Sequence, residues 1–380
     1  MTKHMKTAVT ALVLAAAMVL VVLLVPIGFV ARGPGEAVDL GTADGSPVVA
    51  VQGPQTYQSE GRFFLTTVDQ TPADRRLRLL PAIINHLWPD REVMEWGDVY
   101  QSGSTTAGVA EHDRELMETA QTRATVAALR RIQLDGSPGA AATGPLVREF
   151  VTVNRVQTGG PSDGKLSVGD TMLAIDGQAV FSVAQVVREV RQGNSVGTNL
   201  PIMFQRGSAT LNQTVTLGQS ELGVPTMGVT WEAGYDWWPY LWEVDFDLDP
   251  AIGGDAGGLA LALALYDRLT PGDLAGGSFV AAAGVIELID LPAAAPGEPF
   301  EQPDPPSDVA TLGAVDGIRQ RVVAAEAQGV ALFLAPRANC SDLAGFESPV
   351  QVVPVATFGE AVDVLQRVAA EGSAADVPHC

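Results

Sequence analysis

The chain has 380 residues, of which 47% are hydrophobic and 18% charged, a composition that supports two or three packed domains and excludes a largely disordered protein. Its 44 acidic residues outnumber the 23 basic ones, and the formal net charge is -21. Because so acidic a surface repels nucleic acid, we expect no nucleic-acid partner. Lysine and histidine are scarce, and occur only at Lys3, Lys6, Lys165, His4, His86, His112 and His379. An enzyme site between Lys165 and His379 would therefore have neither an amine nor an imidazole as its general base.

The first predicted element is an apolar helix that crosses a membrane. Residues Thr7 to Ala31 carry no charge, and a helix of 25 residues spans roughly 37 Å, enough for a bilayer. Basic residues precede this run, so the positive-inside rule places the N-terminus in the cytoplasm and everything after Arg32 outside. A cleaved signal peptide is the alternative, although its apolar core is usually shorter. We expect residues 1–32 to form a cytoplasmic stub and a single-pass cell-membrane anchor, with residues 8–30 in the lipid bilayer.

The two cysteines agree with an exported domain. Cys340 lies in a loop-like stretch, and Cys380 is the final residue. In an oxidising compartment, an even pair that ties a C-terminal tail back to its domain is expected to form a disulfide. Two free thiols are the alternative.

Residues 33–142 form the expected extracytoplasmic juxtamembrane region. They begin with strand-like pieces such as Arg62–Val68 and end in a helix over about Glu111–Ile132, followed by a linker at Asp135–Ala140. His112 has an acidic neighbour on each side, yet a solvated helix start explains it better than a role as metal ligand. No catalytic or metal-binding signature appears in this region.

Residues 143–225 change to short β-branched runs broken by glycine, with one amphipathic helix at about Ser182–Gln192. The segments Gly160–Leu166, Val168–Asp170 and Ile175–Gly177 resemble the core of a PDZ domain. Glycines permit the tight turns, and the Asp-Gly pair that ends the last segment is a hairpin signal. The resemblance implies a β-rich domain of this family.

A PDZ domain binds peptides or protein C-termini by adding them as a strand to a sheet edge beside a helix. On this resemblance, the candidate loop that meets a peptide carboxylate is formed by Pro145, Leu146 and Val147. These residues lack the glycines expected there. A PDZ-like module packed against its own neighbour, with no ligand, is the alternative.

Residues 228–372 carry a second resemblance. Ile252–Asp267 with Leu269–Leu274 resembles the nucleophile turn and following helix of Lon-type proteases, and Asp316–Ala325 resembles the helix that carries that family's catalytic lysine. The resemblance implies a Lon-protease-like α/β domain, followed by a tail at 373–380. The combination of anchor, PDZ-like domain and Lon-like domain is similar to a group of membrane-anchored bacterial serine peptidases.

The Lon-type mechanism uses a Ser-Lys dyad, in which a buried lysine with a lowered pKa deprotonates a serine that attacks a peptide carbonyl. By resemblance, the nucleophile position is Ala256, the base position is Arg321 and the supporting threonine position is Ala283. A methyl group cannot attack a carbonyl, and a guanidinium stays protonated. No other register supplies a lysine, because none follows Lys165. The sequence therefore predicts that no catalytic residue is intact.

The same region holds an acidic strand and a proline-rich loop. Asp245, Asp247 and Asp249 share one face of a predicted strand, and Asp255 follows six residues later. Such carboxylates suit calcium or a shared proton, but a solvated acidic face is the favoured interpretation. The proline-rich residues 291–313 predict an extended surface loop near the former cleft.

The sequence thus predicts a multidomain α+β protein with a transmembrane helix, a PDZ-like domain and a Lon-like domain. The leading interpretation is an anchored, extracytoplasmic pseudoprotease that binds peptides or envelope proteins without cutting them. Two alternatives stay open, an active Lon-type serine endopeptidase and a purely structural envelope component. No Gly-x-x-x-x-Gly-Lys loop is present, so we expect no nucleotide, and we expect no other cofactor or metal. Family analogy alone suggests an oligomer.

Overall fold

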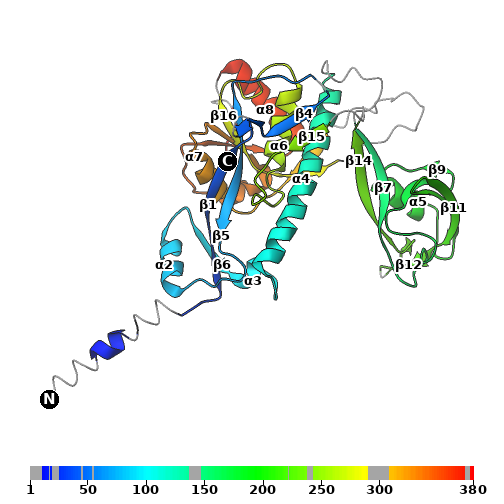
Figure 1. Cartoon of the computed structure of the whole chain (residues 1–380), viewed down its shortest axis with the longest axis horizontal. Coiled ribbons are helices and arrows are strands. Elements are labelled where there is room, and N and C mark those ends of the chain that lie inside the picture. Colours follow the sequence, from blue (N-terminus) through cyan, green and yellow to red (C-terminus); the bar gives the residue numbers. More distant parts are fainter. Residues whose placement is uncertain are drawn as a thin grey trace.

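The computed structural model describes residues 11–16, 18, 25–43, 46–53, 55–136, 147–220, 222–237, 243–289, 308–372 and 377–380. Two six-stranded sheets organise these residues. One sheet combines strands from both ends of the chain, and the other is built from its middle (Figure 1).

The first sheet has the strand order β20-β19-β16-β5-β1-β6. Strands β5, β16, β19 and β20 pair in parallel, whereas β1 pairs antiparallel with β5 and β6. The bounds are β1 Phe29–Asp39, β5 Arg62–Gln70, β6 Glu92–Glu95, β16 Phe279–Ala282, β19 Leu332–Pro336 and β20 Gln351–Val355. Residues 33–142 and 228–372, which differ in sequence pattern, therefore share one sheet.

Alternating side chains divide this sheet between two hydrophobic clusters. On β5, Phe63 and Leu65 belong to the cluster that contains α6 and α8, whereas Phe64 belongs to the cluster that contains α7. The helices are α6 Gly258–Leu269, α7 Ile318–Glu326 and α8 Phe358–Glu371. Helices thus cover both faces, and β19 is accordingly apolar and buried at every position.

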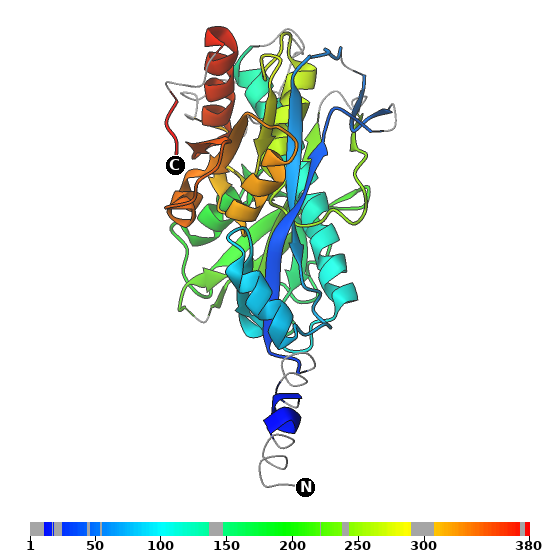
Figure 2. The same cartoon turned by 90° about the vertical axis from the view of Figure 1, so that its left-hand side faces the viewer.

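Helix α4, Thr106–Leu134, packs along α6 and runs the length of the larger body, which is the part of the molecule built around the first sheet (Figures 1 and 2). It begins at the N-cap Thr105, whose hydroxyl accepts the Gly108 N–H at 3.1 Å. Its 29 residues extend over roughly 43 Å. Small buried residues on its inner face, Ala124, Ala127 and Ala128, let the backbones of α4 and α6 approach closely.

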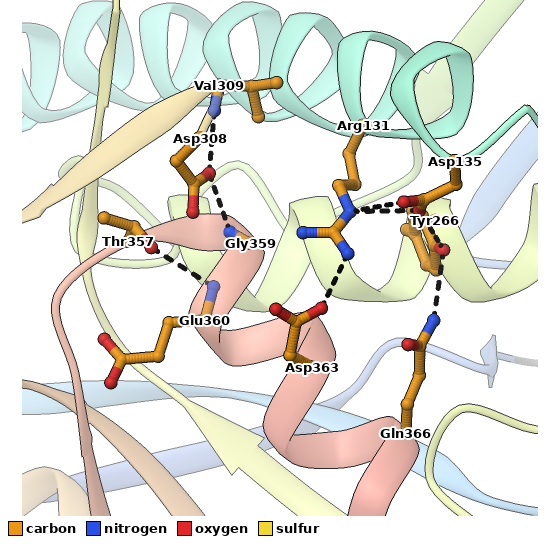
Figure 3. A network of polar contacts seen from close by, with 10 residues as sticks. All are labelled: Arg131, Asp135, Tyr266, Asp308, Val309, Thr357, Gly359, Glu360, Asp363 and Gln366. Atoms are coloured by element: carbon orange, nitrogen blue, oxygen red, sulfur yellow. Dashed lines mark hydrogen bonds and ion pairs between the residues drawn. The ribbon is translucent and has the colours of Figure 1, made fainter. Parts of the chain in front are cut away.

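A polar network holds the C-terminal end of α4 (Figure 3). Arg131 donates to Asp135 at 2.9 Å and to Asp363 of α8 at 2.6 Å. The Tyr266 hydroxyl of α6 donates to Asp135 at 2.6 Å and accepts from Gln366 of α8 at 3.4 Å. Because one guanidinium serves carboxylates on two elements, the network fixes three helices against one another.

The second sheet has the order β11-β10-β8-β7-β14, with β9 beside β8. All its pairings are antiparallel. The bounds are β7 Val147–Val156, β8 Thr171–Ile175, β9 Gln178–Ala179, α5 Val183–Arg191, β10 Asn199–Arg206, β11 Ala209–Thr216 and β14 Val229–Trp237. Figure 1 shows this sheet and α5 as a separate lobe beside α4.

Short elements complete the chain. They are β2 Thr42–Ala43, β3 Ser46–Pro47, β4 Val49–Gln52, α2 Leu79–Leu87, α3 Trp96–Val99, β12 Gly218–Gln219, β13 Pro225–Thr226, β15 Glu243–Phe246, β17 Val285–Leu288, β18 Ala310–Gly313 and the 3-10 helix η2 Arg337–Leu343. The acidic strand corresponds to β15, where Asp245 is exposed, as are Asp247 and Asp249 beyond it. Of the proline-rich segment, residues 291–307 lie outside the described residues.

The predicted transmembrane helix is wrong. No helix within the described ranges is long and apolar enough to cross a membrane. Its C-terminal part, Phe29–Ala31, instead pairs with β6 as the start of β1, and Val30 is completely buried there. Residues 1–10, 17 and 19–24 lie outside the described residues. The predicted fold class is therefore corrected to mixed α/β without a spanning helix, and the single-pass localisation and its orientation lose their basis.

The C-terminal tail is tied to the larger body. A disulfide joins Cys340 in η2 to Cys380. The Cys380 N–H also donates to the Val352 carbonyl of β20 at 3.1 Å, and Val377 is buried in the main hydrophobic cluster. These contacts fasten the last residues to the edge of the first sheet.

Candidate functional site

The first candidate site is the outer edge of β14. This strand ends the second sheet, so only one of its two edges is paired within the described residues. Val147, from the predicted carboxylate loop, lies on the inner strand β7, opposite Trp237 of β14. Pro145 and Leu146 lie outside the described residues. The two edge strands of this sheet are β11 and β14, so Val147 on β7 lies inside the sheet and not at an open edge.

The hydrogen bonds of β7 show which backbone groups of β14 point outward. Val153 donates to the Asp170 carbonyl at 2.9 Å and accepts from Gly169 at 2.8 Å, so both of its polar groups face away from β14. Trp231 lies opposite Val153. In an antiparallel ladder such a pair exchanges no hydrogen bonds, so the N–H and C=O of Trp231 face the open edge. The alternation extends this to Ala233, so the backbone groups of Trp231 and Ala233 both face outward.

Helix α5 lies beside this edge and contacts both β13 and β14. Its start is fixed by a capping box, in which the Ser182 hydroxyl accepts the Gln185 N–H at 3.2 Å. Val186 and Val190 fill the core of the sheet. Five other residues of α5 and its C-cap surround a shallow, mainly apolar hollow of about 610 Å³: Val183, Ala184, Val187, Arg188, Arg191 and Gln192.

The residues before β14 set the direction in which that strand starts. Met227 is buried in the core of the second sheet. Gly228 has φ 68°, and a Cβ added there would lie 2.8 Å from Pro161 Cδ, so only glycine fits. Its carbonyl accepts the Gln157 N–H at 2.9 Å. This turn brings β14 alongside β7 although some 70 residues separate the two strands in sequence.

The second candidate site is a cleft of about 2110 Å³ in the larger body. Strands β1 and β5, the first turns of α4, residues 249–257 and the start of α7 line it. Ala256 and Arg321 lie on its wall, whereas Ala283 is completely buried behind it. The structure thus brings the three predicted Lon-type positions to one place.

Close backbone packing surrounds Ala256. Its carbonyl accepts the Gly284 N–H at 2.8 Å, which joins the turn before α6 to the end of β16. A Cβ on Gly257 would lie 2.5 Å from Leu65 Cδ1, so glycine is required for α6 to meet β5. Ala256 and Ala283 share one apolar cluster, and neither side chain offers a hydroxyl.

Arg321 is 8% exposed. Its Nε donates to the Asp316 carbonyl at 3.0 Å, and its Nη1 donates to the Thr66 carbonyl. Burial and the charge of Arg32 lower the pKa of Arg321 to about 10, and Asp316 and Asp255 oppose this. The guanidinium therefore remains a cation at neutral pH and cannot serve as a base.

A carboxylate that the sequence did not single out also lines the cleft. Burial raises the pKa of Asp113 on α4, the charge of His112 opposes this, and the charge of Asp255 adds to it. The Asp113 carbonyl accepts the Gly254 N–H at 2.8 Å, which ties α4 to the turn before α6. No sequence spacing connects Asp113 to Asp255, because only the packing of α4 brings them close.

A comparison with known families identifies one domain of the chain. Residues 132–217 match the PDZ domain family. Over 67 residues the chain is 39% identical to the pro-apoptotic serine protease NMA111 of Candida glabrata, which covers 18% of this chain and 7% of that protein. The match therefore spans a small part of this curated relative.

Solved PDZ domains of SdrC-like proteins are also similar. The one from Listeria monocytogenes is 26% identical and covers 21% of this chain and 85% of that domain, with a TM-score of 0.21. The one from Listeria innocua is 25% identical and covers 22% of this chain and 93% of that domain, with a TM-score of 0.21. Neither the family match nor the curated relative supports a Lon-type protease domain. The chain therefore contains a PDZ domain, and 67 of its residues match a small part of a serine protease.

Proposed function

We propose that this protein binds extended peptides along β14, within a protease-related PDZ architecture. The observation that carries the proposal is the outer edge of β14, where Trp231 and Ala233 present backbone donors and acceptors on a strand that α5 contacts. An added strand would take its affinity from these groups and its side-chain preference from the apolar hollow on α5. An apolar C-terminal residue suits that hollow.

The test is to remove one outward-facing donor without disturbing the ladder to β7. Display screening of C-terminal peptides against the full chain should yield a binder, and Ala233→Pro should then weaken it at least about tenfold, because proline has no N–H. Ala233→Val, which keeps the N–H, is the matched control. A screen without binders, or equal affinities for both variants, would refute the groove and favour a PDZ domain without a ligand.

We further propose that the larger body is a degenerate Lon-type domain without peptidase activity. What supports this is that Ala256 and Arg321 line one cleft and Ala283 shares an apolar cluster with Ala256, since none of them supplies a nucleophile or a base. In this proposal the domain extends beyond residues 228–372 and includes β1 and β5, which complete its sheet.

Incubation of the full chain with an unfolded protein should give no cleavage, and cleavage that survives controls for contaminants would establish the active alternative. The triple variant Ala256→Ser, Ala283→Thr, Arg321→Lys tests whether the cleft geometry persists. Peptide cleavage by this variant would support descent from a Ser-Lys peptidase. If the wild-type protein neither cleaves nor binds peptides, the result would favour the purely structural role.

A further inference from the structure

Arg321 is a buried cation without a carboxylate partner. Its guanidinium donates to two backbone carbonyls, those of Asp316 and Thr66, and no carboxylate of the described residues lies within 4.0 Å of it. A buried charge is costly unless an opposite charge compensates it. Arg321 lines an open cleft, so a carboxylate from a ligand can reach it.

The neighbouring Arg32 adds to the excess of buried positive charge. Arg32 is 7% exposed, and its charge contributes to the lowered pKa of Arg321. Its own partners are solvated, since the Asp316 side chain at 3.4 Å is 88% exposed and the Glu92 side chain at 3.8 Å is 50% exposed. Exposed carboxylates neutralise a buried guanidinium poorly because water screens them. The inner wall of the cleft is therefore locally positive in a strongly acidic protein.

Two kinds of unused donor lie on the same wall. The Thr66 hydroxyl is completely buried and has no hydrogen-bond partner in the described structure, and Thr66 lines the cleft next to Arg321. The N–H groups of Ala256 and Gly257 precede α6, and they too lack a partner among the described residues. The start of a helix favours negative charge. Arg321 and Thr66, which are in contact, and Ala256 and Gly257 thus all line this cleft.

Carboxylates in the same cleft narrow the choice of anion. Asp113, Asp255 and Asp316 line the same cleft, together with His112. These carboxylates repel a phosphate, which carries up to two negative charges, more strongly than a single carboxylate. Peptides supply such carboxylates as Asp and Glu side chains and as the C-terminus.

We propose that the cleft binds a peptide carboxylate against Arg321, Thr66 and the amides that precede α6. The inference rests on the proposed absence of peptidase chemistry at Ala256. It does not depend on the groove beside β14. The site that holds the scissile peptide in the resembling proteases would here hold a charged group of an uncut peptide.

The test uses the full chain and an N-acetylated, C-terminally amidated hexapeptide with one central Asp, compared with the same peptide carrying Asn. The probe signal is the Nε–H resonance of Arg321, identified by its absence in Arg321→Lys. We expect the Asp peptide to shift this resonance and to bind at least about ten times more tightly than the Asn peptide. Arg321→Gln should abolish this preference. Arg367→Gln, at an exposed position of α8, should leave it unchanged.

Further measurements distinguish side-chain carboxylates from C-terminal carboxylates and keep the test informative if one variant misfolds. The Asn peptide with a free C-terminus tests whether the cleft binds a terminal carboxylate. If Arg321→Gln removes this binding and Ala233→Pro leaves it unchanged, the terminal carboxylate binds in the cleft. Thr66→Val keeps size and should weaken the Asp peptide about threefold or more. Equal binding of Asp and Asn peptides, or tighter binding of inorganic phosphate than of acetate, would overturn the proposal. The comparison of the Asp and Asn peptides does not involve β14. A failure of the proposed peptide binding along β14 can therefore be recognised separately.

Discussion

The two candidate sites differ in the atoms that they present. The groove beside β14 presents backbone N–H and C=O groups, which almost any residue supplies, whereas the cleft presents particular side chains, above all Arg321 and Thr66. A backbone site depends on topology, because what matters is which strand lies at the edge. A side-chain site depends on composition, so a single substitution can remove its chemistry.

This contrast predicts that the two bodies can be destabilised separately. Replacing both cysteines, Cys340→Ser with Cys380→Ser, should lower the free energy of unfolding of the larger body by about 4 kcal/mol, since the disulfide closes a loop with a sequence separation of 40. Hydrogen exchange should show faster exchange in α8 and β20 and unchanged exchange in β7, β8 and β10. Wild-type protein under reducing conditions is the control and should behave alike.

Equal loss of protection in both sheets would contradict separate stability. Such a result would show one cooperative unit, and the ion pair of Arg130 with Glu149 at 3.4 Å, which links α4 to β7, would be the contact to examine next.

The next effect is expected in the PDZ domain alone. Arg206 donates to both carboxylate oxygens of Asp170 at 2.7 Å, and the Asp170 side chain is 1% exposed. Arg206→Ala leaves this carboxylate with the Ser167 N–H as its remaining donor, so we expect a loss of about 2 kcal/mol. Chemical denaturation measures it. Arg155→Ala, at an exposed position of β7, should change stability by less than about 0.5 kcal/mol, and an equal effect would refute the assignment.

The elements around the cleft were easier to predict than the edge strand, for a physical reason. The turn before α6 and the apolar α6 helix have local sequence patterns, whereas the assignment of Ala256 and Arg321 to Lon-type positions came from family resemblance and stays a prediction. The edge strand could not be predicted, because β14 does not pair with β11, the preceding strand of its sheet, but with β7. Nothing local in Val229–Trp237 indicates that pairing.

The N-terminal prediction failed because composition cannot tell a lipid environment from a protein core. Val30 is as apolar as a membrane residue requires, but it is completely buried in a small cluster with Ala73 and Tyr100. The absence of charge from Thr7 to Ala31 satisfies either environment. The pairing of Phe29–Ala31 with β6 decided the outcome for these residues.

The smallest predicted effect is that the two bodies respond to acid in opposite directions. Burial raises the pKa of Asp170, but the hydrogen bonds and charge of Arg206 and the Ser167 N–H outweigh it and hold the pKa below its ordinary value. Its stabilisation is present above that ordinary value, and it is lost as the pH falls through the folded-state pKa. Asp113 has a raised pKa, so its destabilisation is present at neutral pH and is relieved as the pH falls through that raised value.

Hydrogen exchange at several pH values, corrected for intrinsic rates, measures both responses. Between neutral pH and about pH 4, the amides of α4 near the cleft should gain protection by less than about 1 kcal/mol, while those of β8 stay constant. Below about pH 4, β8 should lose protection. Asp113→Asn removes a group that is half-buried beside Asp255, so it should abolish the gain near the cleft and leave the PDZ response intact. A gain that survives Asp113→Asn would place its origin in other carboxylates of the cleft and remove Asp113 as the distinguishing group.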